Sequence, residues 1–155
     1  MRVALYQPEI AGNVGAVMRL GACLGVGVDL IEPMGFAWDD RRVRRTAMDY
    51  IDYVEVIRHP GFQAFCESAG DARLILFTTK ASISPYDFAF SGDDILLFGQ
   101  ESAGVPQEVR DACPASVRLP IRAEVRSLNL ASAVAIGLGE ALRQTGGFPS
   151  PPRNE

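Results

Sequence analysis

Three short stretches of the chain combine amide, carboxylate or hydroxyl side chains with glycine or arginine, and each lies at the carboxyl end of a predicted strand. They read "QPEIAGNVGAVMR" from Gln7, "FGQESAGVP" from Phe98 and "LPIRAEVRSLNLASAV" from Leu119. In parallel α/β sheets, ligands bind beyond the carboxyl ends of the strands. We therefore expect the three stretches to meet at one binding site.

The first stretch opens a predicted helix over residues 12–25. Gly15 and Arg19 are four residues apart and share the face opposite the apolar positions of that helix. Arg19 can present a planar fork of donors to a phosphate. Two interpretations stay open for this stretch: a polar site, or an ordinary Asn13 N-cap with a solvated Arg19.

The second and third stretches have equally ambiguous parts. Gly99 permits a close approach of backbone, Gly104 supports a tight turn, and Glu101 between them places a carboxylate at a strand end. In the third stretch we expect Ser127 to cap a final helix over residues 128–144, with Asn129 in its first turn. Each of these residues could instead have only a structural role, in a loop or as a helix cap.

Positive charge is concentrated in one segment. Four arginines occur within five residues, at Arg41, Arg42, Arg44 and Arg45. The net charge of −4 argues against binding nucleic acid over the whole surface but not against a local patch. The segment is a candidate phosphate-binding patch or a solvated helix face.

Strands and helices alternate along the chain. Apolar runs predict strands at 2–6, 28–32, 53–57, 73–79, 94–99 and 116–120, with helical patterns between them. This order predicts an α/β fold with a largely parallel sheet and helices on both faces. We expect one domain over residues 1–145 and a Gly/Pro-rich tail over 146–155.

Composition limits the class of protein. With 155 residues, 48% of them hydrophobic, the chain can build one proper core. No apolar run approaches the roughly 20 residues of a membrane span, and the N-terminus has no signal pattern. The three dispersed cysteines suggest reduced thiols in a cytoplasmic protein. We expect no metal site, and we interpret the sole histidine, His59, as structural or solvated.

The order of the three motifs resembles that of the SPOUT superfamily of RNA methyltransferases, over almost the whole chain. The segment "IEPMGFAWDDRRVRRTAMDY" is similar to the minimal members that 2′-O-methylate the wobble ribose (position 34) of certain leucine tRNAs, at cytidine or modified uridine. The resemblance implies a C-terminal deep trefoil knot, an S-adenosylmethionine pocket formed by the knotted loops, and a homodimer that binds the tRNA anticodon stem-loop.

The resemblance also suggests roles for particular residues. It implies that strand ends and the third motif surround S-adenosylmethionine, through Phe77, Thr78, Gly99, Glu101, Leu119, Ser127 and Leu128. Asn13 and the four clustered arginines would contact RNA. Arg19 is the expected catalytic residue, but a guanidinium stays protonated in proteins. We expect it to clamp a phosphate and orient the 2′-hydroxyl, while Ser127 or Asn129 assists removal of the proton.

One position departs from the pattern, and two alternatives remain. An aromatic residue usually precedes Glu140 in these minimal members, and here it is Gly139, which leaves the packing of subunits open. The chain could methylate another RNA site, in ribosomal RNA or elsewhere in tRNA, or it could be a binding module without catalysis. A Rossmann-type methyltransferase or dehydrogenase is disfavoured because no G-x-G-x-x-G follows the first strand.

Overall fold

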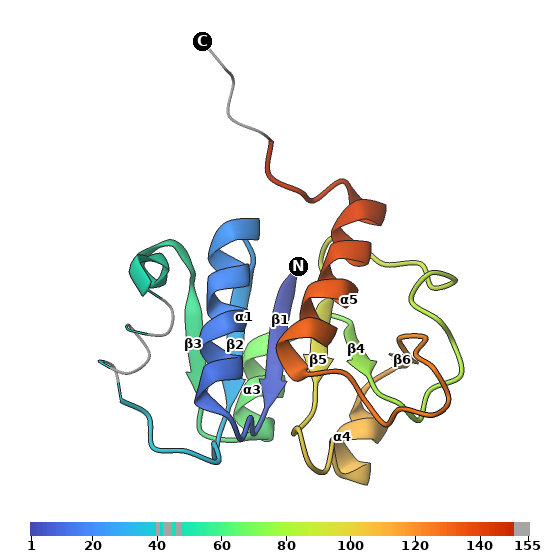
Figure 1. The fold of residues 1–155 in the computed structure, drawn as a ribbon, viewed down its shortest axis with the longest axis horizontal. Helices are drawn as coiled ribbons and strands as arrows, with labels where there is room; N and C mark the ends of the chain where they lie inside the picture. Colours follow the sequence, from blue (N-terminus) through green and yellow to red (C-terminus); the bar gives the residue numbers. More distant parts are fainter. Residues whose placement is uncertain (40, 42–44, 46–47, 151–155) are drawn as a thin grey trace.

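Six parallel strands form one sheet in the computed structural model, which describes residues 1–39, 41, 45 and 48–150 (Figure 1). The order across the sheet is β3-β2-β1-β5-β4-β6. The strands are β1 (Arg2–Tyr6), β2 (Gly27–Ile31), β3 (Val56–His59), β4 (Leu74–Phe77), β5 (Ile95–Phe98) and β6 (Ala115–Val117). The predicted α/β class with a parallel sheet is confirmed.

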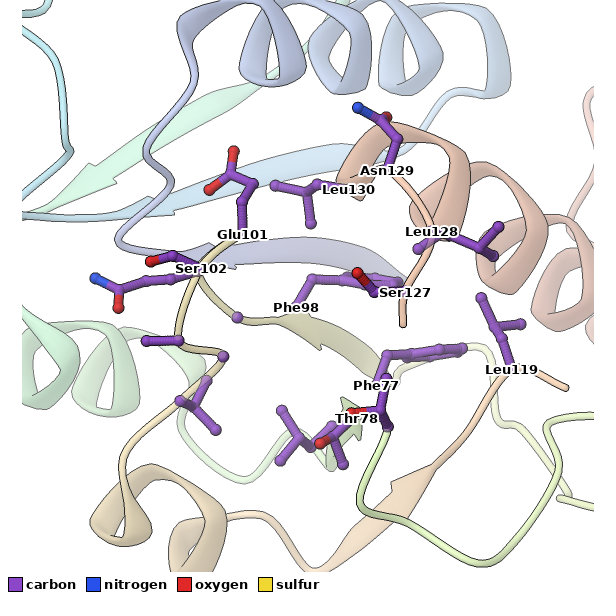
Figure 2. Close-up of a pocket in the computed structure, with 18 of the residues that line it drawn as sticks. Phe77, Thr78, Phe98, Glu101, Ser102, Leu119, Ser127, Leu128, Asn129 and Leu130 are labelled. Carbon is purple, nitrogen blue, oxygen red and sulfur yellow. The ribbon is translucent and has the colours of Figure 1, made fainter. Parts of the chain in front are cut away.

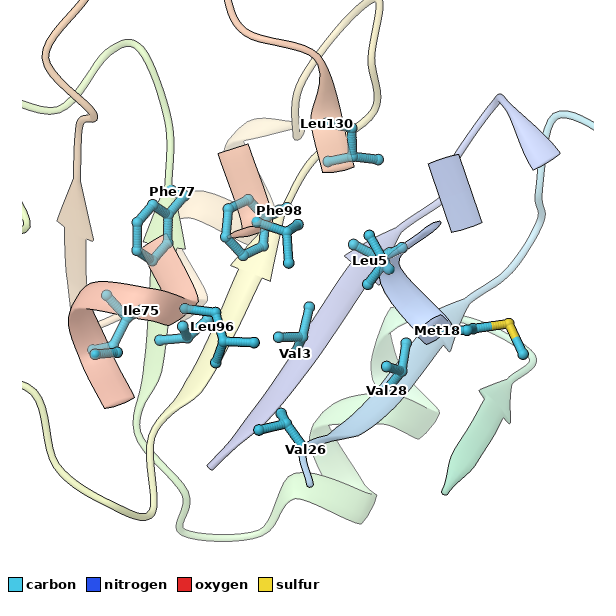
Figure 3. Close-up of a cluster of buried hydrophobic side chains, with 14 of the residues drawn as sticks. Val3, Leu5, Met18, Val26, Val28, Ile75, Phe77, Leu96, Phe98 and Leu130 are labelled. Carbon is cyan, nitrogen blue, oxygen red and sulfur yellow. The ribbon is translucent and has the colours of Figure 1, made fainter. Parts of the chain in front are cut away.

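Helices cover both faces of the sheet. α1 (Ala11–Leu24) and α5 (Leu130–Thr145) pack side by side on one face (Figure 1). Figure 3 shows part of the core on this face, with Met18 and Leu130 beside Val3 and Leu5 of β1. α3 (Phe62–Ala69) and α4 (Gln107–Ala112) lie on the other. Side chains alternate along each strand, so in β1 Val3 and Leu5 join the α1–α5 core while Ala4 and Tyr6 join the second. Burial on both faces explains the near-continuous apolar runs of the strands.

Several predicted boundaries are wrong. The third strand, expected at 53–57, begins at Val56, and a 3-10 helix, Met48–Tyr53, precedes it. Pairing with β2 sets this register, because Val28 lies opposite Val56 and Ile31 opposite His59. Thr78 and Thr79, expected in the fourth strand, lie in a loop after β4, and β6 ends at Val117 rather than at residue 120. The helix α5 begins two residues later than predicted.

His59 is structural. Its Nε2 atom lies 2.8 Å from Oδ1 of Asp29, and both side chains are buried. The Arg2 Nε donates to the other carboxylate oxygen of Asp29 over 2.6 Å. The polar residue in the middle of β2 is therefore satisfied by its neighbours rather than available to a ligand.

The strand order reverses between β1 and β5. From β1 the chain builds outward through β2 and β3, and β5, β4 and β6 occupy the other side. A crevice forms at the carboxyl edge of a parallel sheet where the order reverses, and this is where ligands bind in such folds. The first two motifs follow β1 and β5 directly, so the topology positions them at this crevice. Among the described helices, none has the length and apolar character needed to cross a membrane.

Candidate active site

The carboxylate of Glu101 joins the second motif to the first. It accepts hydrogen bonds from the backbone N–H groups of Glu9 (2.8 Å) and Ile10 (3.2 Å) and from Nδ2 of Asn13 (3.0 Å). These donors surround the start of α1, where backbone N–H groups lack partners within the helix. Glu101 is thus a structural anchor as well as part of the site wall.

Glu9 makes the reciprocal connection. Its carboxylate accepts from the hydroxyl of Ser102 at 2.7 Å and from the backbone N–H of Ser102 at 2.8 Å. These bonds lower the pKa of Glu9 below its usual range, the hydroxyl contributing most. Two carboxylates therefore lock the loops after β1 and β5 together.

Asn13 continues the network into the third motif. Its side-chain oxygen accepts from Nδ2 of Asn129 over 2.9 Å, and Oδ1 of Asn129 accepts from the backbone N–H of Ser132. Asn129, not Ser127, is the N-cap of α5, and Ile10 rather than Asn13 occupies the N-cap of α1. The predicted Ser127 cap is wrong because α5 begins only at Leu130. Of the two interpretations open for Asn13, the structure excludes the N-cap, because Asn13 is buried and bonds to Glu101 and Asn129.

A cavity of about 590 Å³ opens beside this network at the ends of β5, β4 and β6. Figure 2 shows Glu101, Ser102 and Asn129 on one side, Phe77, Thr78 and Leu119 on the other, and Ser127 between them. All seven residues predicted to surround S-adenosylmethionine line the cavity: Phe77, Thr78, Gly99, Glu101, Leu119, Ser127 and Leu128. Asn13 and Asn129 line it too. The three motifs therefore converge as expected.

Glycines shape the wall formed by the second motif. Gln100 and Gly104 exchange backbone hydrogen bonds of 2.8 and 3.0 Å, which close a tight loop, and Gly104 has a φ of +67°. A Cβ on Gly99 would lie 2.5 Å from the carbonyl carbon of Gly104. From the sequence, Gly99 was expected to leave room for a ligand. In the structure, the backbone of Gly104 in the same loop already excludes any side chain at this position.

Aromatic rings form the apolar part of the site. Phe77 stacks on Phe98 with centroids 4.6 Å apart, and Gly137 of α5 makes room for Phe77, because a Cβ there would lie 2.5 Å from the ring. The cavity therefore has two chemically distinct walls. One wall consists of aromatic rings and leucines, and the other of amides and a carboxylate.

Several lining residues were missed from the sequence. Lys80, Arg110 and Arg126 bring positive charge to the cavity, and Ile10 and Ile121 add apolar surface. Arg126 stands beside Ser127 in the third motif, so its position in the chain could have indicated it. Lys80 and Arg110 lie in a loop and a short helix with no distinguishing pattern.

Arg19 does not line this cavity. It is exposed on α1, and its guanidinium carbon lies 4.9 Å from the centroid of the Tyr50 ring. The expectation that Arg19 stands beside the methyl donor is therefore not met within one chain. Of the four clustered arginines, Arg41 and Arg45 are exposed, and Arg42 and Arg44 lie outside the described residues.

The chain belongs to the SpoU rRNA methylase family, whose model matches residues 1–139. The family-level resemblance is thereby confirmed. One relative, from Beijerinckia indica subsp. indica, is a tRNA (cytidine(34)-2′-O)-methyltransferase that is 52% identical over 146 residues, covering 93% of this chain and 91% of its own.

Solved structures agree with this placement. A structure described as giving insights into the 2-OH methylation of C/U34 on tRNA has a TM-score of 0.87 and 41% identity, covering 92% of this chain and 94% of its own. An AdoMet-bound rRNA methyltransferase from Sinorhizobium meliloti has a TM-score of 0.83 and 26% identity. That match covers 92% of this chain but 55% of the other.

Proposed function

We propose that this protein is an S-adenosylmethionine-dependent tRNA methyltransferase that acts in the cytoplasm on the 2′-hydroxyl of the wobble ribose, at cytidine or modified uridine 34 of leucine tRNAs. The observation that carries the proposal is the chain of hydrogen bonds from Glu101 through Asn13 to Asn129, which joins all three motifs beside one cavity. The Beijerinckia relative, which matches almost end to end, supports the choice of substrate.

The cavity fits the methyl donor in size and chemistry. Its 590 Å³ lies within the range of roughly 300–1,000 Å³ found for small-molecule sites. Phe77, Leu119 and Leu128 would cover the flat adenine, and the amide and carboxylate wall would receive polar groups. When bound, S-adenosylmethionine supplies a methyl group on a sulfonium sulfur, which is a good leaving group as a neutral thioether.

The protein's own residues must position the ribose and receive a proton. As the ribose oxygen gains the methyl group, its hydrogen has to leave as a proton. Ser127 is exposed at the cavity and can relay the proton to phosphate or water, and Asn129 can hold the hydroxyl in line. Arg19 keeps its positive charge throughout, so its role is to clamp a neighbouring phosphate rather than to act as a base.

A second copy of the chain completes the site in this proposal. Arg19 lies on the outer face of α1, and the neighbouring outer face of α5 exposes Ala135 and Ile136, the latter 42% exposed. Small and apolar residues exposed on α5 beside α1 suit a homodimer contact. Such a contact would carry Arg19 of one copy to the cavity of the other.

We also propose that the C-terminal segment threads through the loop 78–94 to form the trefoil knot. Two groups of contacts support this path. The backbone N–H of Arg118 donates to Ile83 O over 2.8 Å, and Gln144 at the end of α5 bonds to Pro85 and Phe90 of the same loop. The chain thus meets this loop both before α5 and in the last turn of α5.

The alternative substrate, ribosomal RNA, has less support. The Sinorhizobium rRNA methyltransferase shares just over half of its length with this chain, so it carries a further segment that this chain does not match. A binding module without catalysis has less support too, because the Beijerinckia relative is a methyltransferase that matches almost end to end.

Incubation with labelled S-adenosylmethionine and tRNA from cells lacking the modification tests the proposal. We expect label at the 2′-oxygen of nucleotide 34, identified by nucleoside mapping, and none in ribosomal RNA. Label in ribosomal RNA or at another tRNA position would contradict the proposed substrate, and absence of any transfer would contradict the activity.

A further inference from the structure

A second cavity, of about 320 Å³, lies at the carboxyl ends of β2 and β3. Glu32 directly follows β2 and Pro60 directly follows β3, so the cavity is at the same edge of the parallel sheet as the main site. The lining residues are Glu32, Pro33, Met34, Phe36, Trp38, Arg58 and Pro60. The wall is therefore mostly flat and apolar, with one cation and one carboxylate.

The cation of this cavity is held in a fixed orientation. The guanidinium carbon of Arg58 lies 4.9 Å from the centroid of the Trp38 ring. Nε of Arg58 donates to Oε1 of Glu32 over 3.0 Å, and Nη2 donates to the same oxygen. Trp38 itself is half-buried against the α1–α5 core. An arginine oriented by a ring and a carboxylate loses little further entropy when a ligand binds.

The second cavity is connected rigidly to the main site. Its loop is fixed to the first motif, because the backbone N–H of Gly35 donates to Pro8 O over 2.9 Å. A Cβ on Gly35 would lie 2.8 Å from Cα of Glu9, and Glu9 binds Ser102 of the main site. One network of short contacts thus sets the relative position of the two cavities.

We propose that this second cavity binds an unpaired nucleobase of the RNA that the main site methylates. The inference rests on the proposed function and adds a base-binding site to it. Flat apolar walls and an arginine plane suit the face of a base, and Glu32 can accept from the amino group at its edge. A phosphate suits the cavity less well, because the Glu32 carboxylate would repel it. Exposed Arg41 and Arg45 lie a few residues beyond Trp38 and can hold the adjoining RNA backbone.

Trp38 provides a direct probe, because it is the only tryptophan in the chain. The wild-type protein is titrated with an unmodified anticodon stem-loop RNA and, separately, with a blunt RNA duplex at equal phosphate concentration. We expect saturable quenching of tryptophan fluorescence by the stem-loop and none by the duplex. Equal quenching by both RNAs would overturn the proposal in favour of phosphate binding.

Methyl transfer measured in the same samples separates this inference from the proposed function. Methyl transfer without tryptophan quenching would contradict base binding in the second cavity and leave the proposed activity intact. Tryptophan quenching without methyl transfer would support base binding in the second cavity and contradict the proposed activity.

A matched pair of variants tests the role of Arg58. Arg58→Gln should weaken stem-loop binding about tenfold, as loss of a stacking contact does, and raise KM for the RNA with kcat and the donor KM unchanged. Arg73→Gln is the control, since Arg73 also covers a ring (Phe88, 5.3 Å) and pairs with Asp94, but at the start of β4 on the opposite edge. Glu32→Gln provides a second variant if Arg58→Gln does not fold. Unchanged RNA affinity in a folded variant would overturn the proposal.

Discussion

The side-chain amide of Asn129 donates a hydrogen bond of 2.9 Å to the side chain of Asn13, although 116 positions separate them. Asn13 also donates to Glu101, which is 88 positions from it. Each of the three motifs contributes one member to this chain of bonds. The cavity therefore depends on contacts that only the complete fold brings together.

Truncation of either asparagine should destabilise the protein, and the two effects should not add. Asn129→Ala removes both the cap of α5 and the bond to Asn13, so we expect a loss of about 1–2 kcal/mol in the free energy of unfolding. A double-mutant cycle with Asn13→Ala should give a coupling energy of about 0.5–3 kcal/mol from denaturant unfolding.

Ser127→Ala is the control for that cycle. Ser127 is exposed and does not cap α5, so its replacement should change stability by less than about 0.5 kcal/mol while lowering methyl transfer. A loss of stability equal to that of Asn129→Ala would contradict the observed cap.

Glu101→Gln should affect both stability and binding of the donor. A neutral amide weakens three hydrogen bonds to Glu101 and sets an NH₂ group against N–H donors, so we expect about 2 kcal/mol of destabilisation. Calorimetry should also record weaker uptake of S-adenosylmethionine. Glu67→Gln, on the exposed side of α3, is the matched control and should leave both quantities unchanged.

The sequence predicted the α/β class, the bounds of β1 and the convergence of the three motifs, because these follow from hydrophobic period and the geometry of parallel strands. It did not predict that Asn129 rather than Ser127 caps α5. Both residues are good caps, and the choice depends on Asn13 and Glu101, which are remote in the chain. The start of β3 was missed for the same reason, since pairing with β2 sets it.

The residues that meet in the second cavity could not be predicted from the sequence either. Trp38 and Arg58 are 20 positions apart in segments without a shared motif, and the parallel pairing of β2 with β3 brings Glu32 and Arg58 to the same edge. The position of Arg19 outside the main cavity depends on which side chains of α1 face α5, which periodicity alone leaves open.

Two glycines should respond in opposite ways to replacement by alanine. A Cβ on Gly99 would lie 2.5–2.7 Å from the backbone of Gly104, so Gly99→Ala should destabilise the protein by about 1–3 kcal/mol. A Cβ on Gly139 would meet nothing within 4 Å, and alanine favours a helix interior, so Gly139→Ala should stabilise α5 by about 0.5–1 kcal/mol. Thermal unfolding measures both, and a stable Gly99→Ala would show that the loop can shift.

Acid should remove a stabilising contact at Glu140. Hydrogen bonds from Arg143 and Gln144 lower its pKa from 4.5 to about 2. A carboxyl group whose pKa is lowered by folding contributes stability that is complete above its unfolded pKa and is lost as the pH falls towards the folded value. The difference in Tm between wild type and Glu140→Gln should therefore be constant above pH 4.5 and shrink between pH 4.5 and 2. A difference that persists unchanged to pH 2 would contradict the lowered pKa.

Mixing two inactive variants tests whether Arg19 acts on the cavity of a second copy. Arg19→Ala leaves the cavity intact, and Thr78→Arg fills the cavity but leaves Arg19 in place. If the site spans two chains, a mixed dimer has one complete site, formed by Arg19 of the cavity-blocked chain and the open cavity of the other.

Random reassociation makes half of the dimers mixed, so the mixture should regain about a quarter of wild-type methyl transfer while each variant alone stays inactive. Circular dichroism must first show that both variants are folded. If the two copies do not exchange parts of the site, no mixed dimer holds a complete one and the mixture stays as inactive as its components. That outcome would confine Arg19 to its own chain and require a movement of α1 to bring it to the ribose.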